Sequence, residues 1–340
     1  MSEELDDVLE KEATPIQKDD EVYYSFGPDR ESVHAKEFIN TSGLAVPVGQ
    51  EVVIDGQKVR TGYYSNSSLD SYRRCQKYFD YKYIQKLPTH QGLAMIEGSS
   101  VHKAVEDILR PKVGNPTGQL GSVEEAIQAF RDTFENRIAD ERTVLSDEDK
   151  AGLGKTVDLN VELIKKFHKE LAPVMVPVAV EKMFIVKVPI KGTLGFMPVM
   201  GFIDFIEMTF DHGKFIWDFK TGKHPKKAID IKTNNQLTLY SMAENIPWVG
   251  FINLKKGTQG KPGGISDKTG KQLKGKAGIL TLIEKVVGEE SHKTVTDYER
   301  ITEDISACVR SINAGFFDRT GRGSYLCNKT YCPFYDKCLG

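Results

Sequence analysis

The stretch GFIDFIEMTFDHGKFIWDFKTGK, residues 201–223, contains three charged side chains whose types and spacing suit phosphodiester hydrolysis. Asp218 and Lys220 are separated by one residue, so on a strand both point to the same face, roughly 6–7 Å apart. A chain reversal at DHG would place Asp204 opposite them on the neighbouring strand. The flanking residues are apolar, and charges in such surroundings are costly unless they are paired or bound to metal.

These groups predict metal-assisted chemistry. Asp204 and Asp218 would hold a hard divalent cation, Mg²⁺ or Mn²⁺, which lowers the pKa of a bound water and neutralises charge on the scissile phosphate. Lys220 would position or deprotonate the nucleophilic water, or stabilise the transition state. The alternative is an ordinary surface ion pair between Asp218 and Lys220, because a bare D-x-K is common.

Two helical spacings add suitable side chains. Gln236 and Tyr240 are four residues apart, as are His102 and Glu106, so each pair shares one helix face. The alternative is that these residues have no part in catalysis. A lone histidine on a half-apolar helix is usually structural, and the Gln and Tyr side chains can simply be solvated.

The cysteines are unevenly distributed. Three of the five lie in CNKTYCPFYDKC, residues 327–338, and the others are Cys75 and Cys308. This usage does not match a secreted disulfide framework, so clustered thiols indicate metal or redox chemistry. Cys308 lies on an apolar helical stripe and is interpreted as a buried core residue.

Four motifs in order carry a family resemblance. The set GSSVH, GFID, DFKTG and QLTLY resembles the RecB-type branch of the PD-(D/E)XK nucleases over about residues 65–340, and the ordered set is far more specific than any one motif. The resemblance implies that Lys220 is the catalytic lysine and that Gln236 and Tyr240 contact DNA and support the site. The metal ligands that it implies are His102, Asp204, Asp218 and the backbone carbonyl of Phe219.

Two acidic residues are candidate accessory carboxylates. Glu181 lies in the preceding strand, and Glu106 shares a helix face with His102. An ion pair with Lys182 or Lys187 would explain Glu181 equally well. A histidine ligand makes Mn²⁺ plausible beside Mg²⁺, because imidazole suits the softer ion better.

Some RecB-type nucleases carry a [4Fe–4S] cluster held by one cysteine upstream of the core and three at its C-terminal end. The layout here is similar, with Cys75 followed by Cys327, Cys332 and Cys338, and such a cluster would join the chain's end to the early helix. The terminal spacing of four and five intervening residues departs from the commoner two and five. A Cys₄ zinc site and free thiols remain alternatives, although the paired C-x₂-C of zinc sites is absent.

The elements that must position these residues follow from periodicity. We expect an α/β fold of mixed α+β type, with a PD-(D/E)XK restriction-endonuclease-like core in which helices flank a small mixed sheet. Single helices are predicted over residues 69–87, capped by Asn66, Ser67 or Ser68, and over 229–245. DKAGLGKT ends like a nucleotide-binding P-loop, but Asp149 stands where that motif requires glycine, so no ATP site is expected.

The chain of 340 residues is long enough for one large domain with extensions. The predicted segments are a disordered acidic tail at 1–20, a strand-rich extension at 21–64 and a nuclease domain at 65–340. Within that domain we expect a helical part at 98–170, a catalytic sheet at 175–254, a Lys/Gly-rich loop at 255–278, and a C-terminal helix with the cysteine cluster at 294–340.

The distribution of charge favours DNA as partner, although the net charge is only −2. Lys223, Lys226 and Lys227 follow the catalytic lysine, and the 255–278 loop adds seven lysines that could track a phosphate backbone or simply be solvated. Nearby aromatics could stack on the bases of single-stranded DNA, the favoured substrate, or pack the core around Cys75; they are Tyr72, Tyr78, Phe79 and Tyr81.

These features predict a metal-dependent deoxyribonuclease, a hydrolase acting as exonuclease or endonuclease in recombination, repair or phage DNA processing. A separate helicase or recombination protein would supply any unwinding. Alternatives are a CRISPR-adaptation-type nuclease, a non-catalytic DNA-binding or assembly module that keeps the fold, and a zinc-stapled interaction protein. No apolar stretch could span a bilayer and the start is acidic, so we expect a cytoplasmic protein of a bacterial or phage-infected cell that binds no membrane.

Overall fold

The computed structural model describes residues 14–18, 21–25, 30–55, 57–222, 224–257, 281–321, 324, 326–329 and 331–339. Its centre is a seven-stranded sheet in the order β10-β9-β8-β7-β5-β4, with β6 paired to β7 off this path. The strands are β4 (Val48–Ile54), β5 (Gln57–Ser65), β6 (Pro177–Pro189), β7 (Phe196–Thr209), β8 (Gly213–Lys220), β9 (Val249–Lys255) and β10 (Leu282–Val286).

The sheet is mixed. β7 pairs antiparallel with both β6 and β8, whereas β5 pairs with β7 and β8 with β9 in parallel. Neighbouring residues of β8 alternate between two apolar clusters, with Ile216 in one and Trp217 in the other, because successive side chains of a strand point to opposite faces. Both faces of the sheet are therefore buried, which confirms the mixed α/β prediction.

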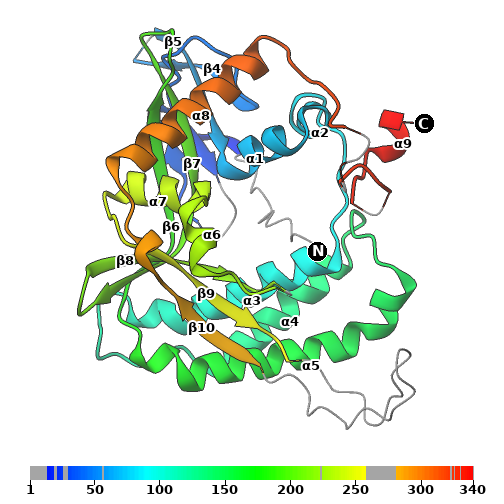
Figure 1. Ribbon diagram of the computed structural model, residues 1–340, viewed down its shortest axis with the longest axis vertical. Coiled ribbons are helices and arrows are strands. Elements are labelled where there is room, and N and C mark those ends of the chain that lie inside the picture. Colours follow the sequence, from blue (N-terminus) through cyan, green and yellow to red (C-terminus); the bar gives the residue numbers. More distant parts are fainter. Residues whose placement is uncertain are drawn as a thin grey trace.

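A layer of helices covers each face of the sheet (Figure 1). One layer holds α3 (Leu93–Leu109), α4 (Val123–Ile138) and α5 (Asp147–Glu170). The other holds α1 (Asn66–Arg74), α7 (Asn235–Glu244) and α8 (Val295–Asn313). The apolar stripe of α3 is buried as its spacing predicts. None of the helices in the described ranges is long and apolar enough to cross a membrane.

The predicted helix over 69–87 is interrupted at Cys75. Its first part, α1, is capped by Ser65 and not by residues 66–68, because the Ser65 hydroxyl accepts from the Ser68 N–H in a reciprocal capping box. Cys75 is extended (φ −160°), and the chain continues as α2 (Gln76–Phe79) and a π-helical turn (Asp80–Ile84). The break allows the Tyr72 and Phe79 rings to pack edge to face at 5.4 Å in the core.

The predicted helix over 229–245 is also two helices. α6 (Ala228–Lys232) ends before Asn234, whose side chain accepts from the Leu237 N–H at 2.8 Å and starts α7. An asparagine competes with helical backbone bonds in this way, and that competition outweighs the continuous polar–apolar pattern. β10 was not predicted, because its five residues directly follow the Lys/Gly-rich stretch; it pairs antiparallel with β9.

The N-terminal extension forms a small sheet of its own. β1 (Thr14–Lys18), β2 (Glu21–Ser25) and β3 (Val33–His34) are antiparallel, so the disorder predicted for 1–20 is wrong at residues 14–18; residues 1–13 and 19–20 lie outside the described part. A third apolar cluster joins Tyr24 to Met200 of β7. The extension therefore packs directly on the central sheet. Residues 258–280, which include most of the predicted 255–278 loop, are not described.

Two glycines of the sequence motifs have different structural reasons. Gly201 of GFID lies across from Phe184 on β6, and an added Cβ would come within 2.8 Å of the Phe184 ring. Gly154 of DKAGLGKT lies inside α5, where an added Cβ meets nothing within 4 Å. The first glycine is required by packing, while the second weakens its helix and forms no phosphate-binding loop.

We therefore expect Gly201→Ala to lower the free energy of unfolding by about 1–3 kcal/mol, because Phe184 must shift. The matched change Gly154→Ala should raise it by about 0.5–1 kcal/mol, because alanine favours the helix. Urea unfolding followed by circular dichroism measures both, and equal stability of the two variants would contradict this account.

Candidate active site

The site forms where two strands separate. The antiparallel ladder between β7 and β8 ends at the pair Phe205–Trp217, and the next residues along are Asp204 and Asp218. Beyond that point the Phe219 N–H donates to Asp204 Oδ2 at 2.8 Å instead of to a strand carbonyl. The hairpin thus places Asp204 opposite the D-x-K segment, as the sequence predicts.

Asp218 and Lys220 form a buried pair. Lys220 Nζ lies 2.9 Å from Asp218 Oδ2, and the two residues are only 7% and 1% exposed. The surface-pair alternative is therefore wrong. Taking a carboxylate and an ammonium out of water costs several kcal/mol per ion, roughly, so a pair kept in such a place has a role beyond stability.

His102 reaches this site from α3. Its Nε2 lies 3.1 Å from the Phe219 carbonyl oxygen, and its Nδ1 lies 3.7 Å from Asp204 Oδ2. Gly98 of GSSVH brings α3 close to the end of β8, since an added Cβ would lie 3.1 Å from Thr221 Oγ1. His102 therefore lies beside two of the predicted metal ligands, Asp204 and the Phe219 carbonyl.

Glu181 completes a row of carboxylates. It lies between the pairs Val180–Phe205 and Lys182–Ile203, which places it opposite Asp204. Its φ of 50° is in the left-handed region, a strained conformation that is uncommon for a residue other than glycine and clusters at functional sites.

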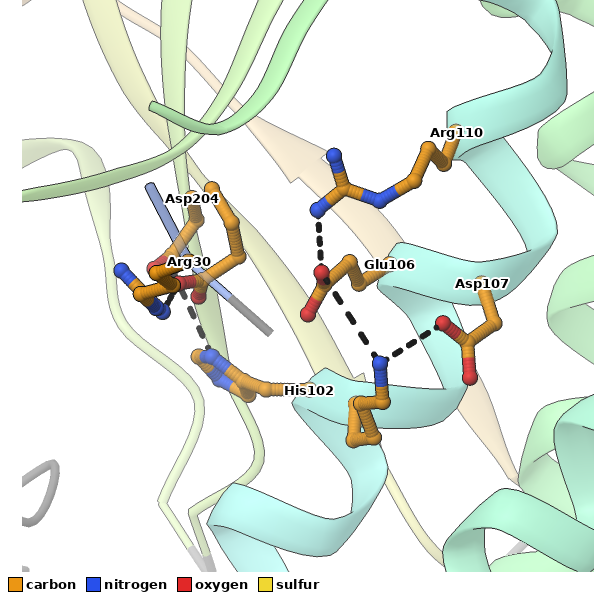
Figure 2. A network of polar contacts seen from close by, with 8 residues as sticks. Arg30, His102, Glu106, Asp107, Arg110 and Asp204 are labelled. Atoms are coloured by element: carbon orange, nitrogen blue, oxygen red, sulfur yellow. Dashed lines mark hydrogen bonds and ion pairs between the residues drawn. The ribbon is translucent and has the colours of Figure 1, made fainter. Parts of the chain in front are cut away.

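The ion pair of Glu181 differs from both sequence alternatives. Its carboxylate pairs with Arg30, and Lys182 pairs with Glu244 at 2.6 Å instead. Figure 2 shows Arg30 beside Asp204 and His102. Sequence reasoning missed Arg30, because a lone arginine in the extension has no motif or spacing that distinguishes it.

The donor set suits a hard divalent cation. Ligand atoms of His102, Glu181 and Asp204 all lie within 4.8 Å of one another. Burial raises the pKa of Asp204 well above its ordinary value, and the nearby carboxylates of Asp218 and Glu181 raise it further. Lys220 and the hydrogen bond from the Phe219 N–H lower this pKa, but by less. A divalent cation would offset this repulsion, so the residues present fit the metal that the sequence predicts.

Within the described part of the chain, Glu106 forms ion pairs with neighbouring residues in the sequence and not with the site. It pairs with Arg110 and lies 4.0 Å from Lys103, which also contacts Asp107 at 3.0 Å (Figure 2). It shares a helix face with His102 as predicted, yet it is outside the cluster of ligand atoms found among the described residues.

Gln236 and Tyr240 line the site from α7. Gln236 Nε2 donates to the Tyr240 hydroxyl at 2.6 Å, and Tyr240 is buried. Burial raises the pKa of Tyr240, and the carboxylates of Asp204 and Asp218 add to this effect, which places the phenol near them. Tyr240 is therefore not simply solvated, and its position agrees with a supporting role.

The basic residues after β8 are only partly described. Asn253, paired with Lys220 across β8 and β9, holds the Lys226 backbone through two hydrogen bonds of 2.9 Å. Lys227 is exposed, and Lys223 lies outside the described residues. Lys256 pairs with Glu97 of α3. The two hydrogen bonds of Asn253 to its backbone thus keep Lys226 beside the active site.

The C-terminus packs against the early helices (Figure 1). One pocket is lined by all four predicted cluster cysteines, and the Phe334 ring lies 5.3 Å from both Tyr78 and Tyr81. α9 (Tyr335–Leu339) ends the described chain. Tyr72 and Phe79 are buried in the core cluster that covers one face of the sheet, whereas Tyr81 is buried against Phe334 in the cysteine pocket.

The four thiols share one pocket, and Cys332 lies near the other three. Burial raises the pKa of Cys332, and the neighbouring thiols of Cys75, Cys338 and Cys327 raise it further. A backbone hydrogen bond from Phe334 acts in the opposite direction and lowers this pKa. No three of the described cysteine sulfurs lie within 4.8 Å of one another. Cys308 is buried in the core cluster beside α1, as predicted.

The similarity of this chain to known proteins bears on its family. A sequence profile of the PD-(D/E)XK nuclease superfamily matches residues 63–339. A solved structure titled "Crystal structure of SSO0001" matches at 12% identity with a TM-score of 0.30, over 74% of this chain and 86% of that one. The comparison with curated proteins finds no match.

Neutralising Asp204 should stabilise the protein without metal. In Asp204→Asn the amide oxygen can still accept from Phe219, while repulsion from Asp218 and Glu181 is removed. We expect a gain of about 1 kcal/mol, or about 1–2 °C in Tm for a chain of this length, in EDTA. Mn²⁺ should raise the Tm of the wild type and leave that of the variant unchanged.

The gain should depend on pH with a defined sign. The folded-state pKa of Asp204 is raised, so its protonated form favours folding, and this contribution is lost as pH rises through the folded-state pKa. The advantage of Asp204→Asn in EDTA should therefore grow with pH. Thermal unfolding across pH tests this, with exposed Asp211→Asn as control; an advantage that shrinks with rising pH would contradict it.

Proposed function

The chain belongs to the PD-(D/E)XK nuclease superfamily, and on that premise we propose that it is a metal-dependent nuclease that hydrolyses DNA, with single strands favoured. The observation that carries the proposal is the buried set of Asp204, Asp218 and Lys220 at the point where β7 and β8 separate. A non-catalytic module would not need to keep these costly charges intact. The four ordered motifs favour the RecB-type branch.

The residues that would hold Mg²⁺ or Mn²⁺ are His102, Asp204, Asp218 and the Phe219 carbonyl, with Glu181 as accessory carboxylate. When bound, the ion lowers the pKa of a water ligand and neutralises charge on the phosphate. Lys220, held by Asp218, donates to the attacking water or to a phosphate oxygen as negative charge develops. Tyr240, on α7, would limit the movement of the carboxylates of Asp204 and Asp218.

Basic side chains beside the site support a nucleic-acid substrate. Lys226 and Lys227 lie in the loop between β8 and α6, and this loop is fixed to β9 through Asn253. A single strand would follow these lysines without base-specific contacts, because the attraction is to its phosphates. We further propose that a separate helicase or recombination protein supplies such a strand from duplex DNA, in recombination, repair or phage DNA processing.

Cleavage of end-labelled single- and double-stranded DNA with Mn²⁺ or Mg²⁺ tests the activity. We expect Lys220→Ala to lower the rate by about 10²–10³-fold, the usual effect of removing one group that stabilises developing charge. Lys214→Ala, an exposed lysine on the same strand, should retain full activity. Equal activity of the Lys220→Ala variant would contradict the assignment, and chelation with EDTA should stop the wild type.

We propose that the four cysteines of the C-terminal pocket hold a [4Fe–4S] cluster. In a tetrahedral zinc site the sulfurs lie roughly 3.8 Å apart, since each Zn–S bond is about 2.3 Å. All four thiols line one pocket, and no three of the described sulfurs lie within 4.8 Å of one another. A larger group therefore fits better, and it would tie the chain's end to the break at Cys75 between α1 and α2.

Protein purified without oxygen should be brown, with broad absorption near 400 nm and stoichiometric iron. Cys332→Ser should lose the colour and lower Tm, because the link between distant segments is removed. Cys308→Ser should keep the colour, since Cys308 lies in the α8 core. Elemental analysis that finds zinc without iron would overturn the cluster assignment.

A further inference from the structure

Arg30 brings a positive charge to the active site from outside the superfamily domain. It precedes β3, whereas the superfamily profile begins at residue 63. Its guanidinium pairs with Glu181, whose ligand atom lies within 4.8 Å of those of His102 and Asp204. The extension therefore reaches the row of carboxylates.

Two contacts fix the orientation of the Arg30 side chain. The guanidinium carbon lies 3.5 Å from the centroid of the Phe202 ring, and Nη2 donates to Glu181 Oε2. Only 16% of the side chain is exposed. Stacking on an aromatic ring and pairing with a carboxylate reduce the freedom of the planar guanidinium, which is how a binding group is preorganised.

One NH₂ group of this fixed guanidinium, Nη1, is buried and has no acceptor among the described residues. A buried donor without an acceptor is unfavourable, so its retention beside a reaction site indicates that an acceptor arrives from outside. No described carboxylate of the site accepts from Nη1, and Glu181 accepts from Nη2 alone.

A phosphodiester oxygen has the chemistry that matches. Arginine N–H groups bind phosphate oxygens through strong charge-assisted hydrogen bonds, and they cannot lose their proton. The carboxylates Glu181, Asp204 and Asp218 repel a polyanion, and the single positive charge of Lys220, which pairs with Asp218, offsets only part of this repulsion. A second fixed cation beside the row would offset this repulsion.

We propose that Arg30 binds a non-bridging oxygen of a substrate phosphate through Nη1, while Glu181 and Phe202 hold its guanidinium in place. The N-terminal extension thus contributes a substrate-binding residue to the nuclease site. This inference rests on the proposed nuclease function and adds a phosphate-binding position to it.

Kinetics of three variants test this role. At saturating Mn²⁺, Arg30→Ala should lower kcat/KM on end-labelled single-stranded DNA by about 10–100-fold, the loss of one charge-assisted hydrogen bond. Arg30→Lys should recover part of that loss, since it keeps the charge without the fork. Arg60→Ala, an exposed arginine of β5 in the same extension, should stay within about twofold of the wild type.

Two further readouts separate substrate binding from a structural role. The Mn²⁺ concentration that gives half-maximal rate should be unchanged in Arg30→Ala. Binding of the same oligonucleotide, measured in a Lys220→Ala background in which cutting is slowed about 10²–10³-fold, should weaken by a similar factor. If instead only the Mn²⁺ requirement rises, Arg30 merely positions Glu181 and the proposal is overturned. Behaviour like that of Arg60→Ala would overturn it as well.

The experiment also distinguishes failure of the proposed function. A wild-type protein that binds DNA without cutting it would refute the nuclease assignment, and the binding comparison would still decide the role of Arg30. A wild-type protein that neither binds nor cuts DNA would refute both.

Discussion

Like charges buried at one point of a sheet are the constraint on which this structure depends. Asp204 and Asp218 lie side by side where the β7–β8 ladder ends, and both are almost completely buried. Such an arrangement persists only because other groups offset the repulsion. Lys220 pairs with one carboxylate, and the Phe219 N–H donates to the other. A divalent cation would offset the repulsion that remains between the carboxylates. The repulsion that lowers the stability of the fold therefore also favours the binding of a cation.

The two helical layers supply the remaining groups from opposite faces of the sheet. α3 brings His102 to the Phe219 carbonyl, and α7 brings Tyr240 to the carboxylates. Each approach depends on a packing feature some distance from the charges: Gly98 permits the close contact of α3 with the end of β8, and Phe184 fills the space above Gly201 and packs on Tyr240 at 5.5 Å. Core packing therefore sets the positions of the polar groups.

Both described ends of the chain are folded back onto this core. The N-terminal extension shares the apolar cluster of Tyr24 and Met200, and it places Arg30 next to Glu181. At the other end, the Tyr72 hydroxyl donates to the Phe316 carbonyl at 2.9 Å, and Phe334 packs between the rings of α2 and the turn after it. Segments far apart in sequence thus complete both sites, which couples their formation to folding of the whole chain.

The sequence alone determined the parts of the site that depend on local geometry. The one-residue spacing of Asp218 and Lys220 fixes them on one face of a strand, the DHG reversal sets Asp204 opposite, and helical spacing pairs Gln236 with Tyr240. Only the tertiary structure decided which charges meet: Glu181 pairs with Arg30 across 151 positions and not with its neighbour Lys182, and Cys75 interrupts a helix that periodicity would continue. Contacts of that kind depend on how distant segments pack together, because local periodicity fixes the direction of a side chain but not its partner across the fold.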